Sequence, residues 1–264
     1  MAYHGVDNEA EPVESKAARV AMKRAGKAAA NPYLDHLCTH FQPILMIGDQ
    51  QESVWGYEAL VRCARPYQHI GADLLLRTMT SQEEHYRLFE AVLDGALAML
   101  KATDTPRVSV NVEPSLLSGR LEHHVRTALE KHEVQPQRLI LELTERVNIA
   151  EQGSQGYRTL HNLVSAGVGV FLDDFFAGEN SLDYLLKLEV SGVKIDKRLT
   201  QEAHLSKRGY HLLRSFVDML GSCGMTGIVE GVETGEMLQA VKSAGANLAQ
   251  GYFWGKPGPM GVNG

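Results

Sequence analysis

Apolar positions divide the chain, from about residue 32 onward, into short apolar runs that alternate with longer stretches of helical periodicity. Short apolar runs bounded by turn residues indicate buried strands, whereas apolar residues spaced three and four apart indicate helices. The runs RVSVNV, RLILELTE, VGVFLDD, GVKID, TGIVEG and NLAQGYF begin at residues 107, 138, 168, 192, 226 and 247. Two earlier runs, HFQPILMI from residue 40 and VWGYEALVR from residue 54, flank a turn-like segment and predict a strand pair.

The intervening stretches predict helices that begin and end with recognisable signals. Ser81 followed three residues later by Glu84 is a capping box, and Gly167, Gly224 and Gly245 stand where helices are expected to end. The expected helices cover residues 72–80, 81–101, 114–131, 157–166, 181–188, 207–223 and 236–244.

About eight strands therefore alternate with helices, with no break in composition that would mark a second domain. This order favours a single (β/α)8 TIM-type barrel, and the early strand pair indicates that one strand near the start is antiparallel. A doubly wound sheet is less favoured because no glycine-rich phosphate fingerprint follows an early strand. The helix after the last strand is expected to be short or missing. We expect residues 1–34 to form a flexible or helical lead-in and residues 35–260 to form the barrel domain.

Composition narrows the possible partners. The chain of 264 residues carries a net charge of −6, which argues against a nucleic-acid polymer as partner because phosphate backbones require a basic surface. The three cysteines are far apart in sequence and suggest neither a zinc site nor a disulfide framework. No signal peptide or long apolar run is evident, so a cytoplasmic protein is the expectation.

Polar side chains recur at the carboxyl ends of the predicted strands, where active sites of such barrels lie. Asp173 and Asp174 leave one strand together, and two unpaired carboxylates are too costly to bury, so they are solvated or hold a cation. The strand ends carry Glu58, Asn111, Glu142, Glu145, Asp173, Asp174, Lys194, Asp196, Glu230, Glu233 and Gln250. Oxygen donors without His or Cys suit a hard cation such as Mg²⁺ or Mn²⁺.

Each strand-end residue also has a plain structural interpretation. One acid at a strand end is more often a helix cap or a surface residue; Asn111 has the position of a cap, and Lys194 has Asp196 close by as an ion-pair partner. Such interpretations would have to hold independently at six or seven strands, which favours a shared site. The histidines lie mostly on helices or near the termini, and none is assigned a role.

The EAL tripeptide and seven further motifs, in order, resemble the EAL-domain cyclic-di-GMP phosphodiesterases over residues 41–257. They are QP at Gln42, EAL at Glu58, NVEPSLL at Asn111, LELTE ending at Glu145, LDDF around Asp173, KID at Lys194, and EGVET with QGYFWGKP at Glu230 and Gln250. The resemblance implies hydrolysis of cyclic di-GMP to linear pGpG with two Mg²⁺ or Mn²⁺ ions, and a homodimer. Two such ions about 3.5–4 Å apart activate a water molecule and neutralise charge on a phosphodiester.

The resemblance also implies a role for each matching residue. Glu230, Lys194 and Glu145 would be catalytic: Glu230 near the attacking water, Lys194 near water and phosphate, and Glu145 holding the loop after Asp174. The implied metal ligands are Glu58, Asn111, Glu142, Asp173 and Asp174. The implied substrate contacts and supporting residues are Gln42, Leu60, Arg62, Asp196, Glu233 and Gln250.

One segment departs from the family. Members usually read DDFGTGYSSL where this chain reads DDFFAGENSL, so Phe176 replaces a glycine whose backbone freedom a larger residue lacks. We expect Phe176 either to fill an apolar gap or to face a protein partner. Such a partner would bind at the segment Phe176–Asn180 or at the N-terminal segment.

Two other functions stay open. The altered loop favours a catalytically weak cyclic-di-GMP receptor or interaction module. A Schiff-base enzyme that uses Lys194 is disfavoured, because such a lysine needs a lowered pKa and the carboxylates around it would raise the pKa.

Overall fold

The structure is a computed structural model that describes residues 31–48, 51–143, 154–176 and 182–260. The predictions for residues 1–30 of the N-terminal segment, for Glu145 and for residues 177–180 of the altered loop concern residues outside these ranges. Contacts group the chain from Tyr33 onward into one unit. Every helix in the described ranges is too short or too polar to cross a membrane.

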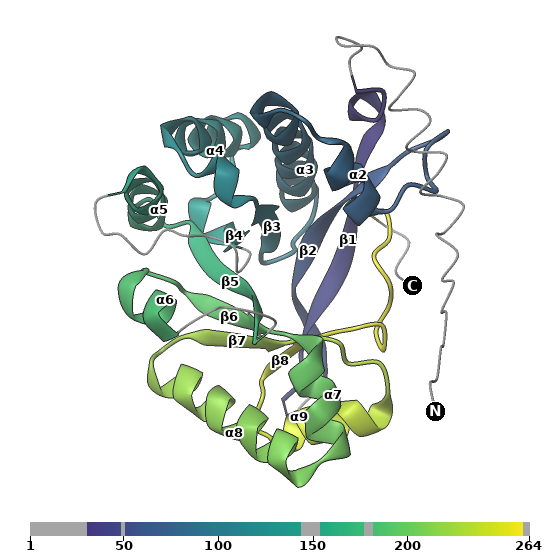
Figure 1. Cartoon of the computed structure of the whole chain (residues 1–264), viewed down its shortest axis with the longest axis vertical. Coiled ribbons are helices and arrows are strands. Elements are labelled where there is room, and N and C mark those ends of the chain that lie inside the picture. Colours follow the sequence, from purple (N-terminus) through teal and green to yellow (C-terminus); the bar gives the residue numbers. More distant parts are fainter. Residues whose placement is uncertain (1–30, 49–50, 144–153, 177–181, 261–264) are drawn as a thin grey trace, which may run out of the picture. The chain divides into compact units, whose positions relative to one another are not determined.

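Eight strands close into a barrel in chain order, as the sequence predicts (Figure 1). Strand β1 runs antiparallel to both of its neighbours, β2 and β8, and the remaining pairs are parallel. The strands are β1 Leu37–Met46, β2 Ser53–Cys63, β3 Val108–Val112, β4 Leu139–Leu143, β5 Gly169–Phe175, β6 Gly192–Ile195, β7 Thr226–Val229 and β8 Leu248–Gln250. The (β/α)8 fold with one antiparallel strand near the start is confirmed.

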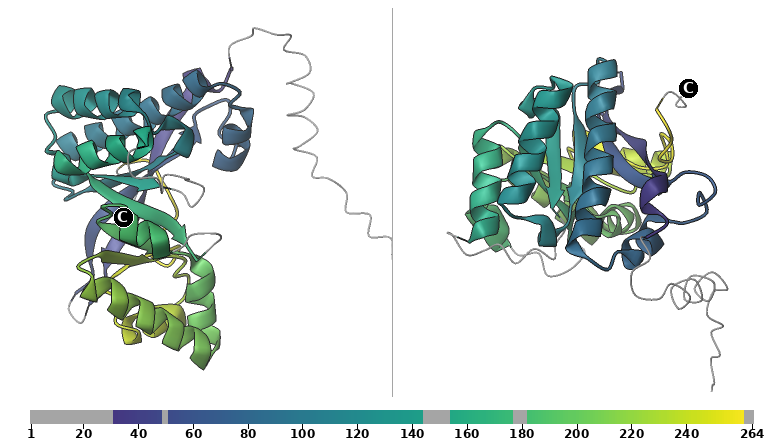
Figure 2. Two further views of the ribbon diagram at one scale, coloured as in Figure 1. Left: turned by 60° about the vertical axis from the view of Figure 1, so that its left-hand side comes forward. Right: turned by 90° about the horizontal axis from the view of Figure 1, so that it is seen from above.

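Helices cover the outside of the barrel (Figures 1 and 2). Helix α3 begins with the predicted capping box, because Ser81 accepts a bond from the Glu84 amide and the Glu84 carboxylate accepts one from the Ser81 amide. The helices are α2 Ala72–Thr78, α3 Gln82–Ala102, α4 Gly119–His132, α5 Gln155–Ser165, α6 Leu182–Lys187, α7 Lys197–Leu205, α8 Lys207–Ser222 and α9 Gly235–Ser243. Three 3₁₀ turns, η1 Leu34–His36, η2 Pro114–Leu116 and η3 Pro136–Arg138, precede β1, α4 and β4. No helix follows β8 within residues 251–260.

One helix prediction was wrong in detail, and one helix was missed. The single helix expected over residues 114–131 is the turn η2 followed by α4, because Ser118 adopts an extended backbone (φ −151°) between them. Helix α7 was not predicted, because its sequence is mostly polar and only Thr200 and Ala203 are buried.

Successive side chains along each strand point alternately outward, under the helices, and inward, into the barrel. Outward side chains, such as Val108, Val110 and Val112 of β3, pack under the helices and form the main core. Inward side chains form two layers, because positions two residues apart share a face of a strand. The lower layer, at the amino ends of the parallel strands, is Ile44, Gly56, Ser109, Ile140, Phe171, Gly192, Ile228 and Leu248. The upper layer, two positions further on every strand, is Gln42, Glu58, Asn111, Glu142, Asp173, Lys194, Glu230 and Gln250.

Candidate functional site

The upper layer brings four carboxylates around one ammonium group. Lys194, on β6, is 1% exposed and comes from a strand whose other residues are apolar or glycine. Its Nζ lies 2.9 Å from Glu142 Oε2, 2.9 Å from Glu230 Oε1, 3.1 Å from Glu58 Oε2 and 3.2 Å from Asp173 Oδ1. The interpretation of Lys194 as a partner of Asp196 is therefore wrong. Asp196 instead accepts a bond from Arg198 Nε at 2.7 Å.

The charges in this group do not balance. Four carboxylates against one ammonium leave three negative charges uncompensated, and buried charge of one sign is costly. Burial and the neighbouring acids therefore raise the pKa of Glu142 well above its ordinary value, against the lowering effect of Lys194. Burial likewise raises the pKa of Glu230 to about 8 although Lys194 opposes it. The pKa of Lys194 is raised because the attraction of Asp173 and the other acids outweighs its burial, so it stays charged.

Glu58 is oriented by amide side chains from β3 and from β8. Asn111 Nδ2 donates to Glu58 Oε1 at 2.9 Å and Gln250 Nε2 donates to Glu58 Oε2 at 2.7 Å. Gln250 also donates to Gln42 Oε1 at 3.1 Å. Burial raises the pKa of Glu58, but Lys194 and these donors outweigh the burial and lower it overall, so this carboxylate stays ionised. Asn111 is therefore part of the site and caps no helix, since Glu113 is the residue that precedes η2.

A β-bulge explains how two consecutive acids reach the same edge of the barrel. On β5 and β6, Leu172 pairs with Val193 and Phe175 with Ile195, so Asp173 and Asp174 together face Lys194. Successive residues of a regular strand point to opposite faces, and an extra residue in a bulge re-aims one of them. Asp174 takes up the change with a left-handed backbone (φ 50°). Ligand atoms of Asp173, Asp174 and Glu230 consequently lie within 4.8 Å of one another.

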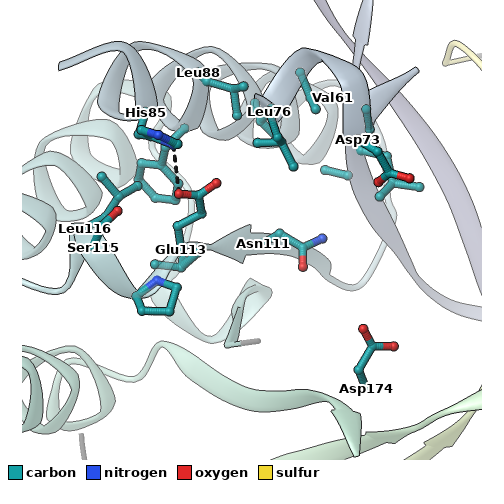
Figure 3. A pocket seen from close by; sticks show the side chains of 17 residues that line it. Val61, Asp73, Leu76, His85, Leu88, Asn111, Glu113, Ser115, Leu116 and Asp174 are labelled. Carbon is teal, nitrogen blue, oxygen red and sulfur yellow. Dashed lines mark ion pairs between the residues drawn. The ribbon is translucent and has the colours of Figure 1, made fainter. Parts of the chain in front are cut away.

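The donor set fits divalent cations. Its oxygens come from carboxylates and the Asn111 amide, it contains no sulfur or imidazole, and it carries surplus negative charge. Asn111 donates through Nδ2 to Glu58, and Figure 3 shows its Oδ1 oxygen on the side that faces Asp174. Oxygen atoms for one cation, and adjacent acids for a second, are thus present.

The remaining predicted residues lie around this group with different surroundings. We call Glu58, Glu142, Asp173 and Glu230 around Lys194 the carboxylate ring. A cavity of about 260 Å³ beside it is lined by Gln42, Glu58, Asp174, Asp196, Glu230, Glu233 and Gln250, among others. Leu60 lines a second, larger cavity. Arg62 follows Leu60 on the same strand face, and its Nη1 donates to the Val61 carbonyl at 2.7 Å. Within the described ranges, the structure therefore joins all the predicted residues except Arg62 to one of these two cavities or to the ring.

Phe176 continues the bulged segment with a second strained residue. Its φ of 81° is in the region that favours glycine, which agrees with the glycine that the resembling family carries there. The ring packs edge-on against Phe216 of α8 at 4.5 Å and against Phe175 at 5.1 Å, although the residue is 48% exposed. Arg198 Nη2 donates to the Phe176 carbonyl at 3.2 Å. Arg198 was not singled out from the sequence, and its only signal there is its place two residues after Asp196.

Comparison with known proteins finds the same family along most of the chain. The model of the EAL domain matches residues 28–257. Cyclic di-GMP phosphodiesterase NbdA of Pseudomonas aeruginosa is 31% identical over 233 residues, which are 86% of this chain and 29% of that protein. Cyclic di-GMP phosphodiesterase RocR of the same organism is 32% identical over 215 residues, 77% of this chain and 53% of RocR. The chain thus spans between about a third and a half of these relatives.

A solved structure agrees with the fold along nearly its whole length. The PaMucR phosphodiesterase in its c-di-GMP complex superposes with a TM-score of 0.76 and 28% identity, covering 92% of this chain and 96% of that one.

Proposed function

Because the chain belongs to the EAL domain family, we propose that it is a cyclic-di-GMP phosphodiesterase that forms linear pGpG with two Mg²⁺ or Mn²⁺ ions. The observation that carries the proposal is the ring of Glu58, Glu142, Asp173 and Glu230 around Lys194, with its uncompensated charge. The names of NbdA, RocR and PaMucR support the choice of nucleotide.

The ring residues divide into two sets of ligands in this proposal. Glu58, Asn111, Glu142 and Asp173 would hold the first cation, and Asp173 with Asp174 the second. Bound there, the two cations act as Lewis acids on the phosphodiester and lower the pKa of a bound water. Asp173 would be the shared ligand, because the bulge lets the adjacent Asp174 reach the same edge of the barrel.

The other polar side chains position the reactants. Lys194 stays protonated among its four acids and donates to a phosphate oxygen, which stabilises charge that develops there. Glu230 accepts a hydrogen bond from the attacking water and orients it toward phosphorus. Gln42 and Gln250 hold the Glu58 carboxylate, since their amides form a chain that ends on Glu58.

Leu60, Arg62, Asp196 and Glu233 stay predicted substrate contacts. A guanidinium suits a phosphate because it donates two parallel hydrogen bonds, and Arg62 would give up its bond to the Val61 carbonyl to do so. Glu145 stays a predicted support of the loop after Asp174.

The test is hydrolysis by the purified protein. Cyclic di-GMP with Mn²⁺ or Mg²⁺ is expected to yield pGpG, measured by chromatography, and EDTA is expected to stop the reaction. Glu58→Gln should abolish turnover, whereas Glu133→Gln, a change at an exposed acid paired with Lys101, should leave it intact. No pGpG above the Glu58→Gln background would overturn the proposal.

The alternative, a cyclic-di-GMP receptor with little turnover, rests on the strained Phe176 beside the ligand segment. Tight nucleotide binding in calorimetry together with no pGpG would establish it. We further propose residues 35–260 as the domain that carries the activity. The homodimer, the cytoplasmic location and a protein partner stay predictions.

A further inference from the structure

We propose that Glu113, held in place by His85, recognises the Watson–Crick edge of one guanine base of the substrate. The inference rests on the proposed function and adds a specificity-determining residue that the resemblance does not assign. Glu113 stands two residues beyond the predicted ligand Asn111, and two residues of extended chain span about 6.6 Å. A group attached to a phosphate at the ring is therefore within reach of Glu113.

A cavity of about 700 Å³ opens beside the carboxylate ring (Figure 3). Its volume is in the range of small-molecule sites, about 300–1,000 Å³. Asn111 and Asp174 line it and also face the ring, so the cavity is continuous with the proposed reaction site. Its walls are largely apolar, and they include Leu60, Leu76, Leu88, Pro114 and Leu116. Apolar walls next to a phosphate site suit a nucleobase.

His85 and Glu113 place one carboxylate at the wall of this cavity. His85 Nδ1, on α3, lies 2.8 Å from Glu113 Oε2, on the turn that begins η2, and their side chains are 22% and 35% exposed. Among the described residues, Oε1 of Glu113 forms no ion pair or hydrogen bond. Figure 3 shows this second oxygen off the His85 contact, on the side of the carboxylate toward Leu76 and Asn111. His85 is thus a positioning residue, and Glu113 offers the acceptors.

A carboxylate in this place selects for guanine. Guanine presents two adjacent donors, N1–H and the 2-amino group, which match the two oxygens of a carboxylate. His85 occupies one lone pair of Oε2, and an ionised carboxylate has about four acceptor sites, so both oxygens can still accept. Adenine presents the N1 lone pair at the corresponding position, which a carboxylate repels. Two other acids line the cavity. Asp174 lies at the proposed metal site, and Asp73 is exposed on α2 at the far side from Glu113, so its charge is more strongly screened.

The chain supplies a matched control. His124 on α4 pairs with Glu90 on α3 through Nδ1 and Oε1 at 2.9 Å, with side chains 28% and 38% exposed. This second His–Glu pair resembles the first in geometry and exposure, yet neither of its residues lines the cavity. Glu113→Gln and Glu90→Gln therefore remove the same charge from similar pairs, and only the first change alters the wall of the cavity.

The experiment measures kcat and KM for cyclic di-GMP and for its inosine analogue, which lacks the 2-amino groups. A hydrogen bond to a charged group contributes roughly 1.5–3 kcal/mol, which corresponds to at least about tenfold in KM. We expect Glu113→Gln to raise KM for cyclic di-GMP about tenfold with kcat within about twofold, and to erase the preference for guanine over hypoxanthine. His85→Gln should raise KM less, and Glu90→Gln should change neither value.

The outcomes separate this inference from the proposed function. If the wild-type protein hydrolyses cyclic di-GMP and Glu113→Gln matches Glu90→Gln in KM and in base preference, the role of Glu113 is overturned and the phosphodiesterase stands. If the wild-type protein binds without turnover, dissociation constants from calorimetry replace KM and the same comparison applies. If it neither hydrolyses nor binds the nucleotide, the proposed function fails, and this inference fails with it.

Discussion

The two inward layers of the barrel lie only two residues apart on every strand, yet they have opposite effects on the stability of the fold. In the lower layer Ile44, Ile140, Phe171, Ile228 and Leu248 pack into one apolar cluster with Trp55 against it. In the upper layer four carboxylates surround Lys194 and leave negative charge uncompensated. The lower layer stabilises the fold, whereas the upper layer costs stability until cations bind.

The comparison shows why such a site tolerates its own charge. The closed barrel and the packed layer below fix the strands, so the acids cannot move apart to relieve their repulsion. Phe171 illustrates the support: a Cβ on Gly192 would lie 2.6 Å from its ring, so the glycine of β6 makes room for the ring two residues before Lys194. The packing of the lower layer therefore offsets the free-energy cost of the repulsion between the acids of the upper layer.

The largest effect should follow a change in the shared carboxylate of the upper layer. Asp173→Asn is expected to lower kcat/KM for cyclic di-GMP by at least about 10³-fold, because it weakens binding of both proposed cations. Asp218→Asn, a change at an exposed acid on α8, is the control and should stay near wild type. Activity of Asp173→Asn within about tenfold of wild type would contradict the bridging role.

Removal of the central ammonium should cost several kcal/mol of stability. Lys194→Met leaves four buried acids without their counter-charge, and a broken buried ion pair costs about 3–5 kcal/mol. Urea unfolding in EDTA measures the loss, and Mn²⁺ should restore part of it because cations replace the missing charge. Equal stability of variant and wild type in EDTA would show that the acids are neutral there.

A change in the lower layer should cost no more stability than Lys194→Met does, but its effect should not depend on metal. Phe171→Ala opens a cavity in the apolar cluster, with an expected loss of about 3 kcal/mol. The stabilisation that Mn²⁺ gives, measured as a shift in the urea midpoint, should remain as in wild type. A loss of that metal response would mean that the two layers are not separate.

The smallest effect concerns the strained end of β5. Phe176→Gly removes the ring contacts with Phe216 but relieves the left-handed backbone, so stability should change by less than about 1 kcal/mol. Phe176→Ala loses the same contacts and keeps the strain, and should be less stable than Phe176→Gly by about 1 kcal/mol. Chemical denaturation of both variants measures this difference in stability. An alanine variant as stable as the glycine variant would show that the backbone is not strained.

Much of the site was readable in the sequence because its residues stand at the ends of apolar runs. Period-two alternation and the barrel topology together imply that Glu142 and Asp173 meet, since each lies two positions after an inward apolar residue. Three features were missed. The bulge at Asp174, the role of Arg198 and the His85–Glu113 pair depend on contacts between segments that no local pattern links.

The sequence by itself determined the order of the eight strands, the antiparallel start and the oxygen-rich set at the strand ends. Apolar periodicity is local, so each element is specified by its own residues. Only the tertiary structure decided that Lys194 pairs with four acids and not with Asp196, and that Phe176 lies on Phe216. These choices depend on burial and on distances across the barrel, which arise only when all eight strands close around one axis.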